Sequence, residues 1–328
     1  MTDRPFILAS RGSRLALWQA NFVAEAVRNM GHAVEIKTWK TTGDIVQDRF
    51  LHEIGGKGLF IKELEDAMKR KQADFAVHSL KDMPARIPAN FELTAVLKRH
   101  SYRDVIIFRK DVAKSIGLPE GSMVSGSILK SLGPLTVATS SLRRKSLLMG
   151  SCPDINTVPV RGNVDTRLQK LEREPWHAII LAEASLERLG ITDVAAHPID
   201  PTWFIPCAGQ GALAIESLRQ SPASQFLTSL ECQDTRLAVD VERNVLAALG
   251  GDCTMPFGCL VTNDEDDNTR LSASAILLSN NGQAATAKVK LGKSTQNLGE
   301  NLERHLLSEL RHNGANDILK SLGLDFRL

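Results

Sequence analysis

The spacing of apolar residues predicts alternating strands and helices from residue 6 to residue 216. Short apolar or alternating runs, typical of strands, lie at 6–9, 34–39, 74–78, 91–97, 105–108, 135–139, 156–160, 178–182 and 212–216. Helical spacing of apolar residues or helix-start signals mark 13–30, 59–71, 140–150, 163–174 and 185–189. Such alternation favours largely parallel sheets covered by helices, and we expect the last of these strands to return to the first sheet.

The pattern changes near residue 234. A helix with apolar residues on one face leads into strands at 257–261, 270–278 and 285–291, followed by a helix at 295–312. This order predicts a small α+β domain at the C-terminal end. Between the strands at 105–108 and 135–139, the segment 115–133 is rich in Gly, Ser and Pro and is expected to be an exposed insertion. The segment 198–206 is expected to be a crossover.

Composition and charge narrow the classes of protein. The 328 residues suffice for two or three domains, and 43% hydrophobic and 24% charged residues are typical of globular chains. A net charge of +2 lacks the basic excess of most nucleic-acid binders. Five cysteines without a CxxC pair favour reduced thiols. With no signal-like N-terminus and no membrane-length apolar run, we expect a cytoplasmic protein that binds neither nucleic acid nor membrane.

Arginines gather where α/β proteins bind ligands. Arg11, Arg143 and Arg161 follow closely on predicted strands, Arg144 is next to Arg143, and Arg167 lies six residues past Arg161. Ligands of open α/β sheets bind beyond the carboxyl ends of the strands. Helix N-termini there favour anions, and arginine binds carboxylates through paired hydrogen bonds. One such arginine is more often a solvated surface residue, but several at one topological position favour an anion site.

Three further segments have candidate chemistry. The glycine-rich 55–58 precedes a predicted helix but matches neither a Walker loop nor GxGxxG, so a flexible loop explains it equally well. Lys81 and Asp82 lie where a predicted strand ends, shortly before Pro84. We therefore expect them at the rim of the same crevice, although an Asp in this position more commonly only caps a turn. Cys253 lies in a loop after two glycines, although a buried structural cysteine is the default. No spaced His/Cys cluster indicates a metal site.

Together the motifs resemble the hydroxymethylbilane synthase family, also called the porphobilinogen deaminases, over essentially the whole chain. The segments that show the resemblance are Arg11 with Ser13, Leu15, Ala16 and Gln19; 55–65 (GGKGLFIKELE); 77–84 (VHSLKDMP); 139–144 (TSSLRR); 161–168 (RGNVDTRL); 209–212 (GQGA); and the loop at Cys253. VHSLKDMP, TSSLRR and RGNVxTRL in this order make a highly specific signature.

The resemblance implies two α/β domains like the halves of a periplasmic binding protein, and a smaller α+β third domain. The expected boundaries are 1–99 with 211–230, then 103–205, then 233–328. It also implies a monomeric transferase of porphyrin and heme biosynthesis, which joins four porphobilinogen molecules into a linear tetrapyrrole and releases ammonia at each step. Such enzymes carry a dipyrromethane cofactor, itself made from substrate, on a loop cysteine through a thioether.

Individual positions match the family's motifs. Asp82 matches the catalytic aspartate and Cys253 the cysteine that carries the cofactor. The positions that match arginines binding acetate and propionate side chains are Arg11, Arg143, Arg144, Arg161, Arg167 and Arg188. The further matched positions are Ser13, Gln19, Lys57, Phe60, Ser79, Lys81, Thr139, Ser140, Ser141, Gly162 and Gln210. Because loss of ammonia leaves a cationic azafulvenium, we expect Asp82 to act mainly as a fixed anion.

Three residues depart from the family's usual pattern. Asp165 and Asp252 stand where glycine is frequent, and Glu183 stands where a small or apolar residue is usual. We expect Asp165 to pair with Arg161 or Arg167. Two other functions stay open: a two-lobed protein that only binds small anions, which would need no loop cysteine, and a nucleotide-dependent transferase, which would need a Walker loop.

Overall fold

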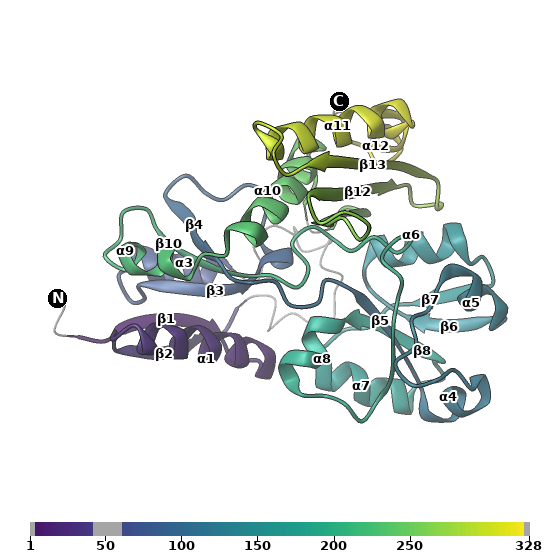
Figure 1. Ribbon diagram of the computed structural model, residues 1–328. Coiled ribbons are helices and arrows are strands. Elements are labelled where there is room, and N and C mark those ends of the chain that lie inside the picture. The colour runs from purple at the N-terminus through teal and green to yellow at the C-terminus, as the bar shows by residue number, and fades with distance from the viewer. Residues whose placement is uncertain (1–3, 42–60, 253, 325–328) are drawn as a thin grey trace.

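The chain folds around three β-sheets. The computed structural model describes residues 4–41, 61–252 and 254–324 and places their strands in two five-stranded sheets and one three-stranded sheet. Figure 1 shows two lobes side by side, with a smaller body above them. We name them lobe 1, lobe 2 and domain 3 in the order of their first residues.

Lobe 1 is built on a sheet with the strand order β2-β1-β3-β10-β4. Its elements are β1 (Phe6–Arg11), α1 (Arg14–Asn29), β2 (Val34–Trp39), α3 (Lys62–Lys69), β3 (Phe75–Ser79), the 3₁₀ turn η1 (Leu80–Asp82), β4 (Phe91–Val96), β10 (Leu213–Leu218), α9 (Ser224–Leu227) and η2 (Thr228–Leu230). β1 is parallel to β2 and β3, whereas β10 is antiparallel to β3 and β4. The expected return of the chain to the first sheet is therefore confirmed.

Lobe 2 repeats this plan with the order β7-β6-β8-β5-β9. Its elements are β5 (Asp104–Phe108), α4 (Lys110–Ile116), α5 (Gly126–Ser131), β6 (Leu135–Ala138), α6 (Leu142–Ser151), β7 (Ile155–Val158), α7 (Val164–Arg173), β8 (Ala178–Ala182), α8 (Glu183–Leu189) and β9 (Ala195–Pro198). β6 is parallel to β7 and β8, and β5 is antiparallel to β8 and β9. Two linkers, 97–103 and 199–212, connect the lobes.

The segment between α4 and β6 differs from the prediction of an exposed insertion. It contains α5, which Ser125 caps by accepting a hydrogen bond from the Ile128 amide. Val124 and Leu129 are fully buried, and Val124 forms a β-bridge to Ile199. A few apolar side chains anchor a stretch whose average composition is that of a loop, so the prediction was wrong for 124–131. Strand β9 was also missed.

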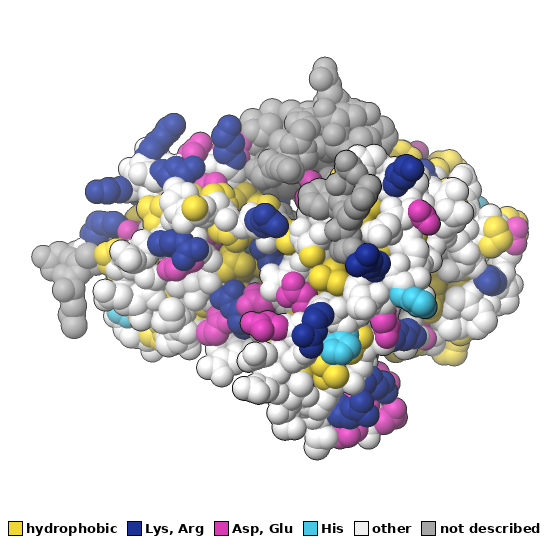
Figure 2. Space-filling model, turned by 90° about the horizontal axis from the view of Figure 1, so that it is seen from above, with side chains coloured by type: hydrophobic (Ala, Val, Ile, Leu, Met, Phe, Trp, Pro, Cys, Tyr) yellow, Lys and Arg dark blue, Asp and Glu magenta, His cyan; other side chains and the backbone are white. Residues whose placement is uncertain are grey.

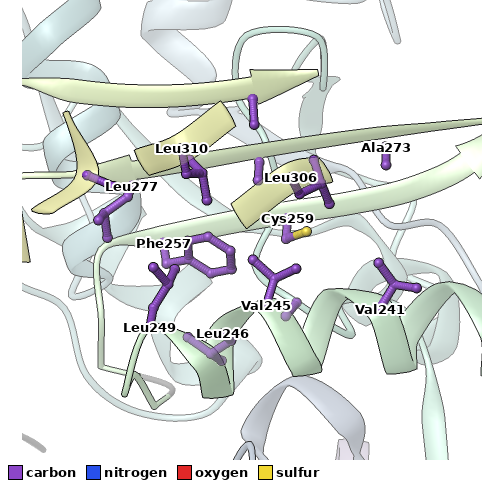
Figure 3. Close-up of a cluster of buried hydrophobic side chains, with 14 of the residues drawn as sticks. Val241, Val245, Leu246, Leu249, Phe257, Cys259, Ala273, Leu277, Leu306 and Leu310 are labelled. Atoms are coloured by element: carbon purple, nitrogen blue, oxygen red, sulfur yellow. The ribbon is translucent and has the colours of Figure 1, made fainter. Parts of the chain in front are cut away.

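In domain 3, helices cover a three-stranded antiparallel sheet. Its elements are α10 (Gln233–Ala248), β11 (Phe257–Asn263), β12 (Arg270–Leu278), β13 (Ala284–Gly292), α11 (Leu298–His312) and α12 (Ala315–Ser321). Figure 3 shows Val241 and Val245 of α10 directed toward the sheet, with Val245 near Phe257 of β11. Leu306 and Leu310 of α11 belong to the same buried cluster. This buried cluster gives domain 3 a hydrophobic core of its own.

A buried ion pair joins domain 3 to the first linker. Arg99 in that linker donates to both carboxylate oxygens of Glu242 on α10, at 2.7 and 3.1 Å, and Glu242 is fully buried. The same carboxylate accepts from the amides of Gly209 and Val261 at 2.7 and 2.9 Å. Both linkers are thereby fixed to one carboxylate of domain 3.

The surface mixes charges of both signs. Figure 2 shows acidic and basic side chains interspersed on the face seen from above. Among the helices of the described ranges, none is long and apolar enough to cross a membrane.

Candidate active site

A cavity of about 700 Å³ lies between the two lobes. Lobe 1 lines it with residues that follow the carboxyl ends of β1, β2 and β3, and lobe 2 with residues that follow β6, β7 and β8. The second linker contributes Gly211 and Ala212. Ligands of open α/β sheets bind at such edges. In this fold the ligand-binding edges of the two lobes face the same cavity.

The described part of the cavity wall is cationic and contains one acid. The basic side chains that line it are Arg11, Lys40, Lys81, Arg144, Arg161, Arg167 and Arg188. Asp82 is the only carboxylate among the described lining residues. Such a field attracts a polyanion and leaves one fixed negative charge inside it. The sequence-based expectation of a carboxylate among arginines is met by this geometry.

Asp82 is the last residue of the short turn η1, which two backbone hydrogen bonds hold in place. The amide of Leu80 donates to Ala212 O at 3.0 Å, and the amide of Met83 donates to Leu80 O at 3.1 Å. Ser79, just before the turn, accepts a hydrogen bond from Gln19 Nε2 at 2.8 Å. Burial lowers the pKa values of Lys81, Arg167 and Arg188 below their ordinary values, and the negative charge of Asp82 partly opposes this shift in each. Asp82 therefore interacts with cations from both lobes.

Arg143 and Arg144 are held by a buried acid that the sequence analysis did not single out. Arg143 Nη2 and Arg144 Nη2 each lie 2.7 Å from an oxygen of Asp104, the first residue of β5. Arg143 Nη1 also donates to Ile205 O, and Arg144 Nη1 to Ile180 O, both at 2.8 Å. Arg144 lines the cavity, whereas Arg143 does not. Arg143 is thus held by buried protein oxygens, and its contact with a ligand stays a prediction.

The segment that follows β7 shapes one side of the cavity around Gly162. This glycine has a φ of +115°, and a Cβ built on it would lie 2.7 Å from Cγ2 of Thr166. Its carbonyl accepts from Arg167 Nε at 2.8 Å. Burial lowers the pKa of Arg167 to about 10, and the charge of Arg144 adds to this effect. Arg161, Gly162 and Arg167 all line the cavity, as expected for a site that holds an anion.

Arg188 reaches the cavity from α8 and contacts the second linker. Its Nη2 donates to Gly211 O at 2.7 Å, and Nε is buried without a hydrogen-bond partner among the residues that the structure describes. Burial lowers the pKa of Arg188 to about 10. A buried cation of this kind is stabilised when an anion enters beside it.

The predicted polar residues divide into wall residues and supporting residues. Ser13, Ser79 and Ser140 line the cavity, and Ser13 caps α1 through the Ala16 amide. The remaining four are Gln19, Thr139, Ser141 and Gln210, which do not line it. Ser141 caps α6 through the Arg144 amide at 3.4 Å, and its own amide donates to Thr139 Oγ1 at 3.2 Å. These contacts orient helix starts that face the site.

Lys57, Phe60 and Cys253 lie outside the described residues. On the N-terminal side of Cys253, Asp252 accepts from the Thr254 amide at 2.9 Å and from the Thr254 hydroxyl at 2.5 Å. Within 4–41, 61–252 and 254–324, no group of three or more His, Cys, Asp or Glu side chains could hold a metal ion.

The other two unusual acids make contacts at the junction of the lobes. Asp165 does not pair with Arg161 or Arg167 as expected but with Arg14 of α1, at 2.9 Å. Arg14 Nη2 also donates to Leu189 O at 3.1 Å. Glu183 accepts from the Ser101 hydroxyl and lies 3.9 Å from Arg103. Both acids thus bind partners far away in the sequence, which nearby spacing could not indicate.

Comparisons with known proteins agree with the geometry. Residues 6–225 match the family model described as porphobilinogen deaminase, dipyromethane cofactor binding domain. A porphobilinogen deaminase of Ralstonia nicotianae is 40% identical over 97% of this chain and 92% of its own length. One from Burkholderia vietnamiensis is 45% identical over 76% of this chain and 72% of its own.

Among solved structures, the chain is similar to the second substrate binding domain of a putative amino acid ABC transporter from Streptococcus pneumoniae. The match covers 75% of this chain and 95% of that domain's chain. Its sequence identity is 12% and its TM-score 0.41, and we draw nothing from that likeness. The family model and the two curated relatives span enough of the chain for an assignment. The chain therefore belongs to the porphobilinogen deaminase family.

Proposed function

We propose that this chain is a hydroxymethylbilane synthase, which joins four porphobilinogen molecules into a linear tetrapyrrole and releases ammonia at each step. The observation that supports this most is the composition of the interlobe cavity, whose described lining residues include one carboxylate, Asp82, and seven basic side chains. Each porphobilinogen carries two carboxylates, so the growing product is a polyanion. A wall of fixed cations suits such a ligand, and a non-catalytic anion-binding protein would gain nothing from the acid.

In this proposal, Asp82 stabilises the cation that forms during the reaction. The carbon–nitrogen bond of the substrate's aminomethyl group breaks, and its electron pair leaves with the nitrogen as ammonia. The azafulvenium that remains is positively charged and accepts the electron pair of a pyrrole carbon, which then loses its proton. A preorganised anion stabilises such a transition state without reorganisation. Because the leaving amine is already an ammonium, the step needs no strong general acid.

We assign the carboxylate side chains of the product to the cations of the wall. Arg11, Arg161, Arg167 and Arg188 line the cavity, and Lys81 lies beside Asp82. Arg144 faces the cavity with Nε, Nη1 and Nη2 already bonded to protein oxygens. It therefore contributes mainly as a charge, and Arg143 acts from behind the wall.

A dipyrromethane fits the same wall, since its acetate and propionate groups require the cations found there. We propose that Cys253 attaches it through a thioether and that the cations named above hold its carboxylates. When bound, the group supplies the pyrrole carbon that receives the first substrate. We further propose domains at 1–99 with 211–230, 103–205 and 233–328, and a cytoplasmic monomer that binds neither nucleic acid nor membrane.

Replacement of Asp82 tests the proposed role. Asp82→Asn keeps the shape of the side chain but removes its charge, and loss of one preorganised electrostatic group costs about 10²–10³ in kcat. Asp193→Asn, which removes an exposed acid of lobe 2, is the control and should keep wild-type kcat. Porphobilinogen consumption and ammonia release give the rates. Near-normal turnover of Asp82→Asn would sink the mechanism.

A further inference from the structure

Asp104 is a buried acid that links several parts of the site. It is 1% exposed and accepts hydrogen bonds from Arg143, from two nitrogens of Arg144, and from Gln210 Nε2 at 3.2 Å. Burial raises the pKa of Asp104, but the charges of Arg143 and Arg144 outweigh it and hold the pKa below its usual value. One carboxylate thus balances two adjacent cations of α6.

Gln210 extends this cluster toward lobe 1. It is fully buried in the second linker, and its Nε2 also donates to Tyr102 O at 2.8 Å. Its Oε1 accepts from Lys81 Nζ at 3.4 Å. The path from Asp104 through Gln210 therefore crosses from lobe 2, by way of the linker, to the residue that precedes Asp82.

Charges from several elements act on the Lys81 ammonium. Burial lowers the pKa of Lys81 below its ordinary value. Cys207, Asp82 and Asp104 oppose this shift, and Arg144 adds to it. Removal of the Asp104 charge would leave Arg144 unbalanced beside Lys81, which destabilises the ammonium because like charges disfavour the charged form.

We propose that Asp104 is a positioning residue of the site: through Gln210 it orients Lys81 beside Asp82, and it balances the charge of Arg144 at the cavity wall. Lys81 is thereby presented as an ammonium to a carboxylate of the ligand. Only this last assignment rests on the proposed function, because the contacts of Asp104 and Gln210 exist whatever the cavity binds.

The experiment measures the titration of Lys81 without any turnover. Acetylation of Lys81 by acetic anhydride is followed against pH by peptide mass spectrometry of the purified enzyme, with the exposed Lys114 as internal reference. In Asp104→Asn the pH midpoint for Lys81 should fall, by about one unit, while that of Lys114 stays. Asp111→Asn removes an exposed acid of lobe 2 that is likewise paired with an arginine and should leave the Lys81 midpoint unchanged.

A second variant keeps the test decisive if Asp104→Asn fails to fold. Asp104→Asn with Arg143→Met removes one buried charge of each sign but leaves Arg144 beside Lys81, so the Lys81 midpoint should still fall. Gln210→Leu should raise the KM for porphobilinogen more than it lowers kcat, because Lys81 loses its acceptor. A folded variant without the Asp104 charge that shows the wild-type midpoint would overturn the proposal. A wild-type enzyme that does not consume porphobilinogen, together with a shifted midpoint in Asp104→Asn, would instead contradict only the proposed function.

Discussion

Replacement of Gly162 by alanine tests whether the backbone of this segment sets the cavity's arginines. The glycine's φ of +115° lies outside the region that other residues adopt readily, and the added Cβ would meet Thr166 at 2.7 Å. Backbone strain of this kind costs about 1–3 kcal/mol, and forced packing adds about 1–3 kcal/mol. The sum, about 2–6 kcal/mol, is a large part of the stability of a typical domain, about 5–15 kcal/mol.

The same substitution should also reduce catalysis. Relief of the clash has to move the backbone between Arg161 and Arg167, and the Gly162 carbonyl holds Arg167 Nε. A displacement of about 1 Å in a substrate-positioning group can cost about 100-fold in rate. We therefore expect kcat/KM for porphobilinogen to fall by about ten- to a hundredfold in Gly162→Ala.

Gly117→Ala is the matched control. Gly117 ends α4 with a φ of +67°, and nothing lies within 4 Å of a Cβ built on it. Its left-handed conformation costs alanine about 1–2 kcal/mol, but no arginine of the cavity should move. Calorimetric Tm and kcat/KM are compared for both variants. If Gly162→Ala loses no more Tm or activity than Gly117→Ala, Gly162 does not set the arginines as argued.

Two other predictions concern charge. Arg14→Ala removes the exposed ion pair with Asp165 across the junction of the lobes, which is worth about 0.2–1 kcal/mol. Because salt screens such a pair, the initial rates of the variant should depend less on ionic strength, between about 0.05 and 0.5 M salt, than those of wild type. An unchanged salt dependence would contradict a role for the pair. Because the folded-state pKa of Asp104 lies below its usual 3.8, its pairing stabilises the fold above that pH and is lost as the pH falls toward the folded-state pKa. The loss of folded protein with falling pH, followed by circular dichroism, should therefore become steeper below about pH 4. This steepening should be smaller in Arg143→Met, and identical acid-unfolding profiles of the two proteins would count against the pairing.

The sequence predicted the elements that place the site because short-range patterns determine them. Strands at 34–39 and 178–182 have the expected bounds, and the motifs place Asp82 and Arg161 at the carboxyl ends of β3 and β7. Apolar periodicity and glycine or proline signals act over a few residues, which is the range that such reasoning covers.

Partners far apart in the chain could not be predicted in this way. Asp165 pairs with Arg14, which lies 151 residues away, although two arginines stand within four residues of it. Asp104 opens a buried strand, where nothing nearby signals that Arg143 and Arg144 will meet it. The partners of buried charges are set by the packing of whole lobes, so only the folded chain shows that Asp104 pairs with Arg143 and Arg144.

The central claim is that Cys253 anchors a dipyrrole inside a cavity in which Asp82 stabilises the reacting cation. Intact-mass measurement of the purified protein tests it most directly. The wild-type chain should be heavier than its sequence by the mass of two pyrrole units, and Cys253→Ser should have the sequence mass and no activity. A wild-type protein that is active at the unmodified mass would contradict the account.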